Sequence, residues 1–161
     1  AIWANNPQTD TLDALMTQVC QFAHEHLEPL GVRHRFSLPS DIPARPLSAE
    51  ARRNLFLAAK EAIHNAAQHA RPSEVRITLR PGPDCCELVI ADNGCGMPAV
   101  SGAVASSDRQ MQPPDAARRR AQAGHGLANM RHRLEVLGGR LSIVSTPQAG
   151  TTVTLQFPVS P

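Results

Sequence analysis

The sequence predicts an α+β two-layer sandwich. Three segments carry apolar residues at helical spacing, and most strands that alternate apolar and polar residues come in pairs joined by a short turn. Helices mixed with hairpin-linked strands can bury their apolar faces as two layers around one core. With 161 residues, of which 42% are hydrophobic, the chain is long enough for one such domain.

The predicted helices have recognisable ends. They cover residues 9–28, 48–70 and 127–137. Side chains with an oxygen acceptor stand at the starts of the first two, and glycine or proline follows each end. The first predicted helix has Thr9 or Asp10 as its cap and ends before Gly31. The second has Ser48 as its cap and ends before Pro72. The third ends before the pair Gly138-Gly139.

The strands are predicted from the alternation of apolar and polar residues. They cover residues 32–38, 74–80, 86–91, 140–145 and 151–157. A turn at residues 81–84 joins the second strand to the third, and the turn around Pro147 and Gly150 joins the last two. Residues 98–123 are rich in Ala, Ser, Pro, Gln and Arg without periodicity, so we expect a functional or mobile loop there.

Composition excludes several classes of function. The net charge is +2, so bulk electrostatics indicate neither a nucleic acid nor an anionic membrane as partner. Aromatic residues make up 3% and there is no Tyr, which argues against a base-stacking surface. No apolar run approaches the roughly 20 residues that span a bilayer. The chain begins with Ala1 and has no signal peptide pattern, so we expect a cytoplasmic piece of a longer protein.

The four cysteines do not form a metal or disulfide pattern. They are Cys20, Cys85, Cys86 and Cys95, and none belongs to a CxxC pair. The adjacent Cys85 and Cys86 should point to opposite faces of a strand. We therefore interpret all four as reduced cytosolic thiols.

The stretch KEAIHNAAQHA, residues 60–70, places polar residues beside a seam of small ones. Glu61 and Asn65 lie on the shoulder of this seam, one helical turn apart. The asparagine oxygen is a neutral ligand for a hard cation such as Mg²⁺, and the glutamate can orient water or accept a proton. Taken alone, the segment is better explained as an amphipathic helix with a polar rim. The seam consists of Leu55, Ala59, Ala62, Ala66 and Ala70.

The stretch VIADNGCGM, residues 89–97, ends an apolar strand with a carboxylate. Asp92 can accept a hydrogen bond from an exocyclic amine. Gly94 and Gly96 allow the backbone to approach a flat ligand closely. A simple turn or a calcium loop would use similar residues.

Two further motifs complete the set. In GHGLANMRHR, residues 124–133, Gly124 and Gly126 precede a predicted helix whose first N–H groups would bind an anion. The alternative is a glycine linker into an ordinary helix. Thr151 opens the final predicted strand, where a threonine is otherwise an ordinary strand residue.

The succession of these motifs resembles the Bergerat-fold ATPases, which include gyrase, mismatch-repair ATPases, heat-shock chaperones and histidine kinases. KEAIHNAAQHA is similar to the N box, ADNGCGM to the G1 box, and GHGLANMRHRLEVLGGRLSI with GTTVTLQFP to the G2 and closing region. Over about residues 30–158 the chain looks most like the ATP-binding catalytic domain of nitrate-sensor-type histidine kinases. That fold has a mixed sheet covered by helices on one face.

The resemblance implies roles for individual residues. Asn65 would hold Mg²⁺ against the ATP phosphates, and Asp92 would accept the adenine amino group. Glu61 would order the Mg²⁺ shell or assist proton removal, which makes Glu61 and Asn65 the implied catalytic pair. The implied nucleotide site as a whole comprises Asn65, Asp92, Gly94, Gly96, Gly124, His125, Gly126, Leu127 and Thr151.

The resemblance also implies an activity and a domain organisation. Residues 1–29 would be a tail and lead-in helix, and residues 30–161 the catalytic domain, with 98–123 as a mobile ATP lid. The domain would donate the γ-phosphoryl of ATP to a histidine on a separate dimerisation domain, since no His-Asp acceptor pattern is present here. The phosphoryl would pass to an aspartate of a LuxR-like response regulator. The whole would be a membrane-bound sensor, with no nucleic-acid or membrane contact by this part.

One departure keeps alternatives open. Many family members carry Lys three residues after the N-box asparagine, where this chain has Gln68. The phosphate contact would then be missing, or supplied by Arg118–Arg120 or His125, unless the arginines are a solvated linker. The alternatives are an ATPase that drives a conformational cycle, an anti-sigma serine kinase, and a module that senses nucleotide without catalysis.

Overall fold

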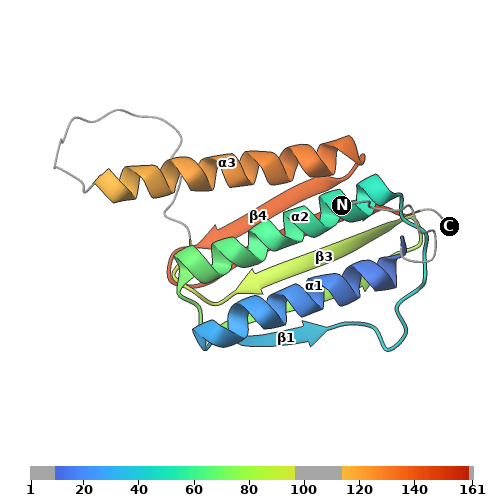
Figure 1. The fold of residues 1–161 in the computed structure, drawn as a ribbon, viewed down its shortest axis with the longest axis horizontal. Coiled ribbons are helices and arrows are strands. Elements are labelled where there is room, and N and C mark those ends of the chain that lie inside the picture. The colour runs from blue at the N-terminus through green and yellow to red at the C-terminus, as the bar shows by residue number, and fades with distance from the viewer. Residues whose placement is uncertain (1–9, 97–113, 160–161) are drawn as a thin grey trace.

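The computed structural model describes residues 10–96 and 114–159. They form one layer of helices over one sheet (Figure 1). The helical elements are α1 (Leu12–Leu27), the 3-10 turn η1 (Glu28–Leu30), α2 (Ala49–Asn65), the π-turn η2 (Ala66–Ala70) and α3 (Pro114–Val136). The strands are β1 (Arg33–Ser37), β2 (Glu74–Pro81), β3 (Cys85–Asp92), β4 (Arg140–Thr146) and β5 (Gly150–Pro158).

The sheet is mixed, as expected for this fold class. Its strand order is β1-β2-β3-β5-β4. The β1–β2 pair is parallel, and the other pairs are antiparallel. Three helices, α1, α2 and α3, cover the same face of the sheet (Figure 1). The predicted α+β two-layer sandwich is therefore confirmed.

Alternation along the strands directs one set of side chains into the core. Ile77 of β2, Ile90 of β3 and Val153 of β5 occupy one row across the sheet and are all buried. They join a single hydrophobic cluster with the apolar residues of the helices. The same alternation buries Cys86 and leaves Cys85 half-buried, and all four cysteines are free thiols.

Helix α1 belongs to this core and is not separate from it. Its buried apolar residues lie in the same cluster as those of the sheet. The segment before α2 is also tied to α1, because Leu12 N–H donates to Arg45 O at 2.9 Å and Arg52 pairs with Asp10 at 2.7 Å. The hydrophobic core therefore includes residues on both sides of position 30. The predicted cap is also wrong, since α1 follows Thr11, whose side chain makes no capping hydrogen bond.

Helix α2 follows the sequence prediction closely. Ser48 Oγ accepts from Ala51 N–H at 3.0 Å, which confirms the predicted cap. All five seam residues are buried. The last turn, however, widens into the π-turn η2 and ends at Arg71, which has a left-handed φ of 45°. None of the described helices is both long and apolar enough to cross a bilayer.

Helix α3 is much longer than predicted. It begins at Pro114 instead of residue 127, so only residues 98–113 of the expected loop lie outside the described part of the chain. The sequence predicts a loop there because the segment lacks apolar periodicity. Helix propensity explains the difference, since alanine, arginine and glutamine favour a helix in any order, and proline suits the first helical position.

The packing of α1 on α2 places an imidazole where protonation is unfavourable. The His26 ring stacks on Phe22 with centroids 5.2 Å apart and lies 5.4 Å from the ring of His64. Burial lowers the pKa of His26, and the positive charges of His64 and Lys60 lower it further. The unfolded chain therefore binds this proton more readily than the folded chain does.

We expect this histidine to make the fold sensitive to mild acid. The free energy of unfolding should decrease as the pH falls below the ordinary imidazole value of 6.5. His26→Gln should reduce that dependence, whereas the same change at exposed His132 should preserve it. Urea unfolding of the three proteins at several pH values measures the slopes. Equal slopes for His26→Gln and the unsubstituted chain would contradict the assignment.

Candidate functional site

The first part of the site is a carboxylate at the end of β3. Asp92 is the last residue of this strand and lies opposite Thr151, near the start of β5. Its Oδ1 atom accepts from Gly94 N–H at 2.9 Å and from Thr151 N–H at 3.4 Å. Both side chains share the helix-facing side of the sheet with the buried Ile90 and Val153. The strand ends thus present an acceptor towards the helical layer, as the sequence predicts.

The loop after β3 closes onto the end of the second helix. Cys95 N–H donates to Ala70 O at 2.8 Å. A Cβ atom at Gly94 would collide with the carbonyl and side chain of Ala70, so only glycine permits this approach. Asn93 fixes the other side of the loop by accepting from the N–H groups of Ser73 and Glu74 at 3.0 and 2.9 Å. Asp92 is thereby held beside the C-terminal end of the α2–η2 helix.

The second part of the site is the row along α2. Asn65 is the last residue of α2, Glu61 lies one turn earlier, and both are half-buried. Residues 61–70 span roughly 13 Å along the helix at about 1.5 Å per residue. The row therefore runs from the Asp92 loop at one end to α3 at the other.

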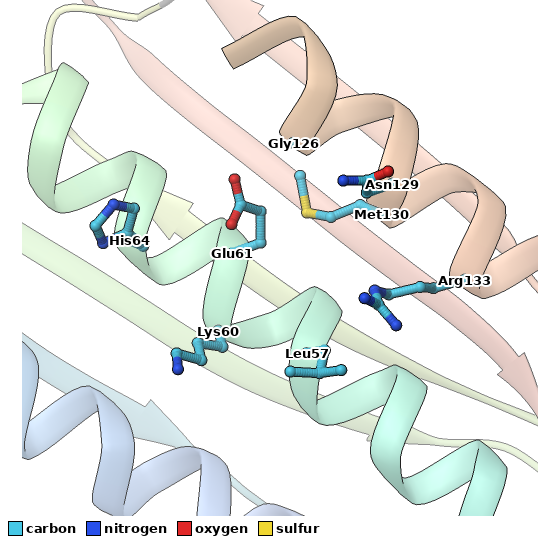
Figure 2. A pocket seen from close by; sticks show the side chains of 8 residues that line it. All are labelled: Leu57, Lys60, Glu61, His64, Gly126, Asn129, Met130 and Arg133. Atoms are coloured by element: carbon cyan, nitrogen blue, oxygen red, sulfur yellow. The ribbon is translucent and has the colours of Figure 1, made fainter. Parts of the chain in front are cut away.

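Glu61 makes the contact with α3. Its carboxylate points towards the turn of α3 that holds Gly126 and Met130 (Figure 2). A Cβ atom at Gly126 would displace the Glu61 carboxylate, because its Oε1 atom occupies that space in the observed packing. Further along the same interface, Arg133 donates to Asn54 Oδ1 at 3.0 Å.

A cavity of about 350 Å³ opens between α2 and α3 around this contact. Its lining combines Glu61 with the cationic Lys60 and Arg133 (Figure 2). Asp92 and Thr151 do not line it. The cavity thus extends the far end of the α2 row and is not the pocket for a base at the strand ends.

The glycine motif of α3 does not lie where the sequence analysis expects it. Gly124, His125, Gly126 and Leu127 are all inside α3, ten or more residues after its start at Pro114. Their N–H groups are therefore not the first turn of a helix, and the expected anion site is absent from this conformation. His125 is exposed, and Leu127 packs partly against the core.

Electrostatics distinguish Asp92 from the exposed carboxylates. Burial raises the pKa of the Asp92 carboxyl, and the hydrogen bonds from the Gly94 and Thr151 N–H groups oppose this by stabilising the charged form. Within the described residues, Oδ2 receives no hydrogen bond. A ligand amine that donates to this oxygen would compensate part of the desolvation of the carboxylate.

The described side chains of the site could hold a metal ion only together with a bound nucleotide, which would supply further oxygen ligands. In the described part of the chain, no group of three or more His, Cys, Asp or Glu side chains could hold an ion. Mg²⁺ in nucleotide sites commonly takes one or two protein oxygens, with phosphates and waters as its remaining ligands. The half-buried carboxamide of Asn65 suits that arrangement.

Sequence analysis missed two residues of the site. Ser145 of β4 is 2.9 Å from Thr151, between the two hydroxyl oxygens. Arg133 lines the cavity through its position in α3. Neither motif spacing nor periodicity singles out Ser145, because its neighbour in space is set by the register of β4 on β5. Arg133 belongs to the MRHR run, where its helical spacing from Gly126 is the available signal.

Comparison with known proteins agrees with this geometry. Residues 50–161 match the family described as histidine kinase-, DNA gyrase B- and HSP90-like ATPase. The nitrate/nitrite sensor protein NarX of Escherichia coli strain K12 is 28% identical over 120 residues, which are 74% of this chain and 17% of that protein. The sensor histidine kinase LnrJ of Bacillus subtilis is 27% identical over 150 residues, 93% of this chain and 32% of that protein.

Solved structures share the fold. The histidine kinase domain of the Erythrobacter litoralis EL346 blue-light activated kinase superposes with a TM-score of 0.63 at 18% identity, covering 99% of this chain and 65% of that one. The chain spans between 17% and 32% of the length of the two curated relatives. The chain belongs to the family of histidine kinase-, DNA gyrase B- and HSP90-like ATPases, and within it to the catalytic domains of sensor histidine kinases.

Proposed function

We propose that this domain binds Mg·ATP along the α2 row and donates its γ-phosphoryl to a histidine nitrogen on a separate dimerisation domain of the same protein. A response-regulator aspartate, of the LuxR-like type, then receives the phosphoryl. The protein acts in the cytoplasm, as the inner part of a membrane-bound sensor. Such transfer depends mainly on positioning and on electrostatic stabilisation of the phosphoryl group.

The proposal rests mainly on one contact: the loop that follows Asp92 packs against the end of the α2–η2 helix at Ala70. The Asp92 loop touches that helix end, and Asn65 and Glu61 follow along the same helix. Adenine bound to Asp92 would lay its triphosphate along the row. Gly94 and Gly96 let the loop that would border the base pack closely against Ala70 and Thr146. Thr151 would complete that end of the pocket. The family match supports ATP as the ligand.

Asn65 and Glu61 serve the phosphate end. Asn65 would hold Mg²⁺ through its amide oxygen, and the ion would supply charge neutralisation at the phosphates. Glu61 would accept the proton that the acceptor imidazole loses, or order the water around the ion. The cationic Lys60 and Arg133 of the adjoining cavity favour a negatively charged group there.

The acceptor histidine is proposed to belong to another domain, because His24, His34 and His64 are poorly placed to receive the phosphoryl group. An acceptor nitrogen must approach the γ-phosphate in line, at roughly 3–3.5 Å. His64 is part of the row-bearing helix α2 and lines the cavity wall. His24 and His34 contact each other at 3.0 Å on α1 and β1, in elements that make no part of the row.

Phosphate binding by Gly124–Leu127 requires a change in α3. In the observed helix their N–H groups lie in the interior, and Gly126 packs on Glu61. If α3 instead began near Leu127, those N–H groups would become free for the phosphates. Two glycines weaken a helix at this point by roughly 1 kcal/mol each relative to alanine. Residues 98–123 would then form the ATP lid, with His125 beside the phosphates.

Gly124→Ala should therefore weaken ATP binding. Alanine favours the continuous helix by roughly 1 kcal/mol, which corresponds to about a fivefold loss of affinity. Ala128→Gly is the matched control, because residue 128 is helical in both arrangements and exposed here. Titration calorimetry with Mg·ATP measures both variants. Unchanged affinity in Gly124→Ala would show that α3 stays intact when nucleotide binds.

The proposed function is tested first by nucleotide binding. Titration calorimetry of the unsubstituted chain should give saturable binding of ATP and ADP, stronger than that of GTP. Guanine presents a carbonyl where adenine presents its amino group, and Asp92 would repel it. Equal binding of GTP would contradict the assignment of Asp92, and absence of ATP binding would contradict the function.

A further inference from the structure

Three polar side chains form one row across the ends of three strands. Asp92 of β3 lies opposite Thr151 of β5, and Thr151 lies opposite Ser145 of β4. All three point to the helix-facing side, since each alternates in step with a core-facing neighbour such as Val153. Ser145 is therefore part of the wall that faces the proposed base site, although no motif marks it.

The two hydroxyls of this row are hydrogen-bonded to each other. Ser145 Oγ and Thr151 Oγ1 are 2.9 Å apart, and geometry alone allows either to donate. Both side chains are half-buried, which limits their exchange with bulk water. The direction of this one hydrogen bond determines whether Thr151 offers a ligand a proton or only lone pairs.

Backbone contacts fix the position of Ser145. It lies in the β4–β5 ladder, and a Cβ atom at Gly96 would be 3.2 Å from its Oγ. Gly96 has a φ of +73°, and Gln148 N–H donates to Cys95 O at 2.7 Å. The loop after β3 is thereby held against the β4–β5 turn, with Ser145 at the junction.

The Asp92 carboxylate favours one direction of the hydroxyl pair. Side chains directly opposite on antiparallel strands lie about 5 Å apart at their Cβ atoms. If Thr151 donated to Ser145, it would turn lone pairs towards this negative charge. If Ser145 donates to Thr151, the Thr151 proton is free to turn towards the carboxylate side, where the field is favourable.

We propose that Ser145 is a positioning residue that makes Thr151 a hydrogen-bond donor and thereby sets the preference for adenine over guanine. Together, the Asp92 acceptor and the Thr151 donor match the adenine edge, on which the 6-amino group donates and N1 accepts. On guanine the two positions are reversed, because O6 accepts a hydrogen bond and the N1–H group donates one. This role rests on the proposed function, because it requires a nucleotide base at the strand ends.

The test compares ATP with 1-deaza-ATP, in which a C–H group replaces N1 and the 6-amino group is kept. The unsubstituted chain should bind ATP about three- to tenfold more tightly, as expected for one neutral hydrogen bond. Ser145→Ala should lose this preference by weakening ATP alone. Ser145→Thr should restore it, because the hydroxyl returns. Ser142→Ala, on the exposed outer side of the same strand, should behave as the unsubstituted chain.

A double-variant cycle separates positioning from a structural role. In a Thr151→Val background, the effect of Ser145→Ala on ATP affinity should vanish, because the hydroxyl that Ser145 orients is gone. Equal weakening of both nucleotides by Ser145→Ala, or a preference that survives it, would overturn the role of Ser145 while leaving ATP binding established. Failure of the unsubstituted chain to bind ATP would overturn this role and the proposed function together.

Discussion

Asp92→Asn should weaken ATP binding by about ten- to a hundredfold. The substitution removes the charge that accepts the adenine amino group, and a hydrogen bond to a charged group is worth roughly 1.5–3 kcal/mol. The fold should persist, because the asparagine oxygen can still accept from the N–H groups of Gly94 and Thr151, as Asp92 Oδ1 does. Titration calorimetry gives the affinity, and thermal unfolding checks the fold.

A matched control isolates the role of the site. Asp84→Asn makes the same change at an exposed position in the turn between β2 and β3, so it should leave affinity unaltered. The discrimination against GTP should also shrink in Asp92→Asn, since the amide can turn its N–H₂ group towards a guanine carbonyl. An Asp92→Asn protein that binds ATP normally would place the base somewhere else.

Asn65→Ala should abolish the contribution of Mg²⁺ to ATP affinity. In the unsubstituted chain, chelation of Mg²⁺ should weaken ATP binding by about tenfold or more, the scale of a lost contact with a charged group. In the variant, affinity should be low and the same with and without Mg²⁺. Alanine is the strongest helix former, so the end of α2 should remain folded.

Gln21→Ala is the control for this variant, because it removes an exposed carboxamide from α1, which has no part in the α2 row. Its response to Mg²⁺ should match that of the unsubstituted chain. If Asn65→Ala kept the full response, the ion would be held by other oxygens and the catalytic role of Asn65 would be wrong.

Much of the fold can be predicted from the sequence because local rules and burial agree there. The Ser48 cap, the small-residue seam of α2 and both hairpins follow from side-chain chemistry and periodicity. Each strand end lies within one residue of its predicted position. The position of Asp92 at a strand end follows in the same way, since the apolar run that precedes it defines the strand.

The errors have two physical origins. The extent of α3 depends on helix propensity, which gives no periodic signal. The two glycines of α3 predict a helix start because glycine disfavours a helix interior, although it does not exclude one. Contacts set by tertiary packing are the other origin. The approach of Gly126 to Glu61 and the pairing of Ser145 with Thr151 join residues far apart in the helix layer or on separate strands.

Helix α1 shows a third kind of difference. Its apolar stripe is evident in the sequence, yet its partner is not, because a stripe specifies burial without specifying the surface that buries it. The structure packs it into the core with α2 and β1. A fragment that began at residue 30 would therefore expose part of this core.

Transfer of the γ-phosphoryl is the most direct test of the account. The chain is incubated with Mg²⁺ and γ-labelled ATP, alone and with the isolated dimerisation domain of the same protein. Acid-labile label should accumulate on the dimerisation domain and not on this chain, and Asn65→Ala should slow the labelling strongly. Acid-labile label on this chain itself, or release of ADP with the dimerisation domain left unlabelled, would contradict a catalytic domain that serves a separate acceptor histidine.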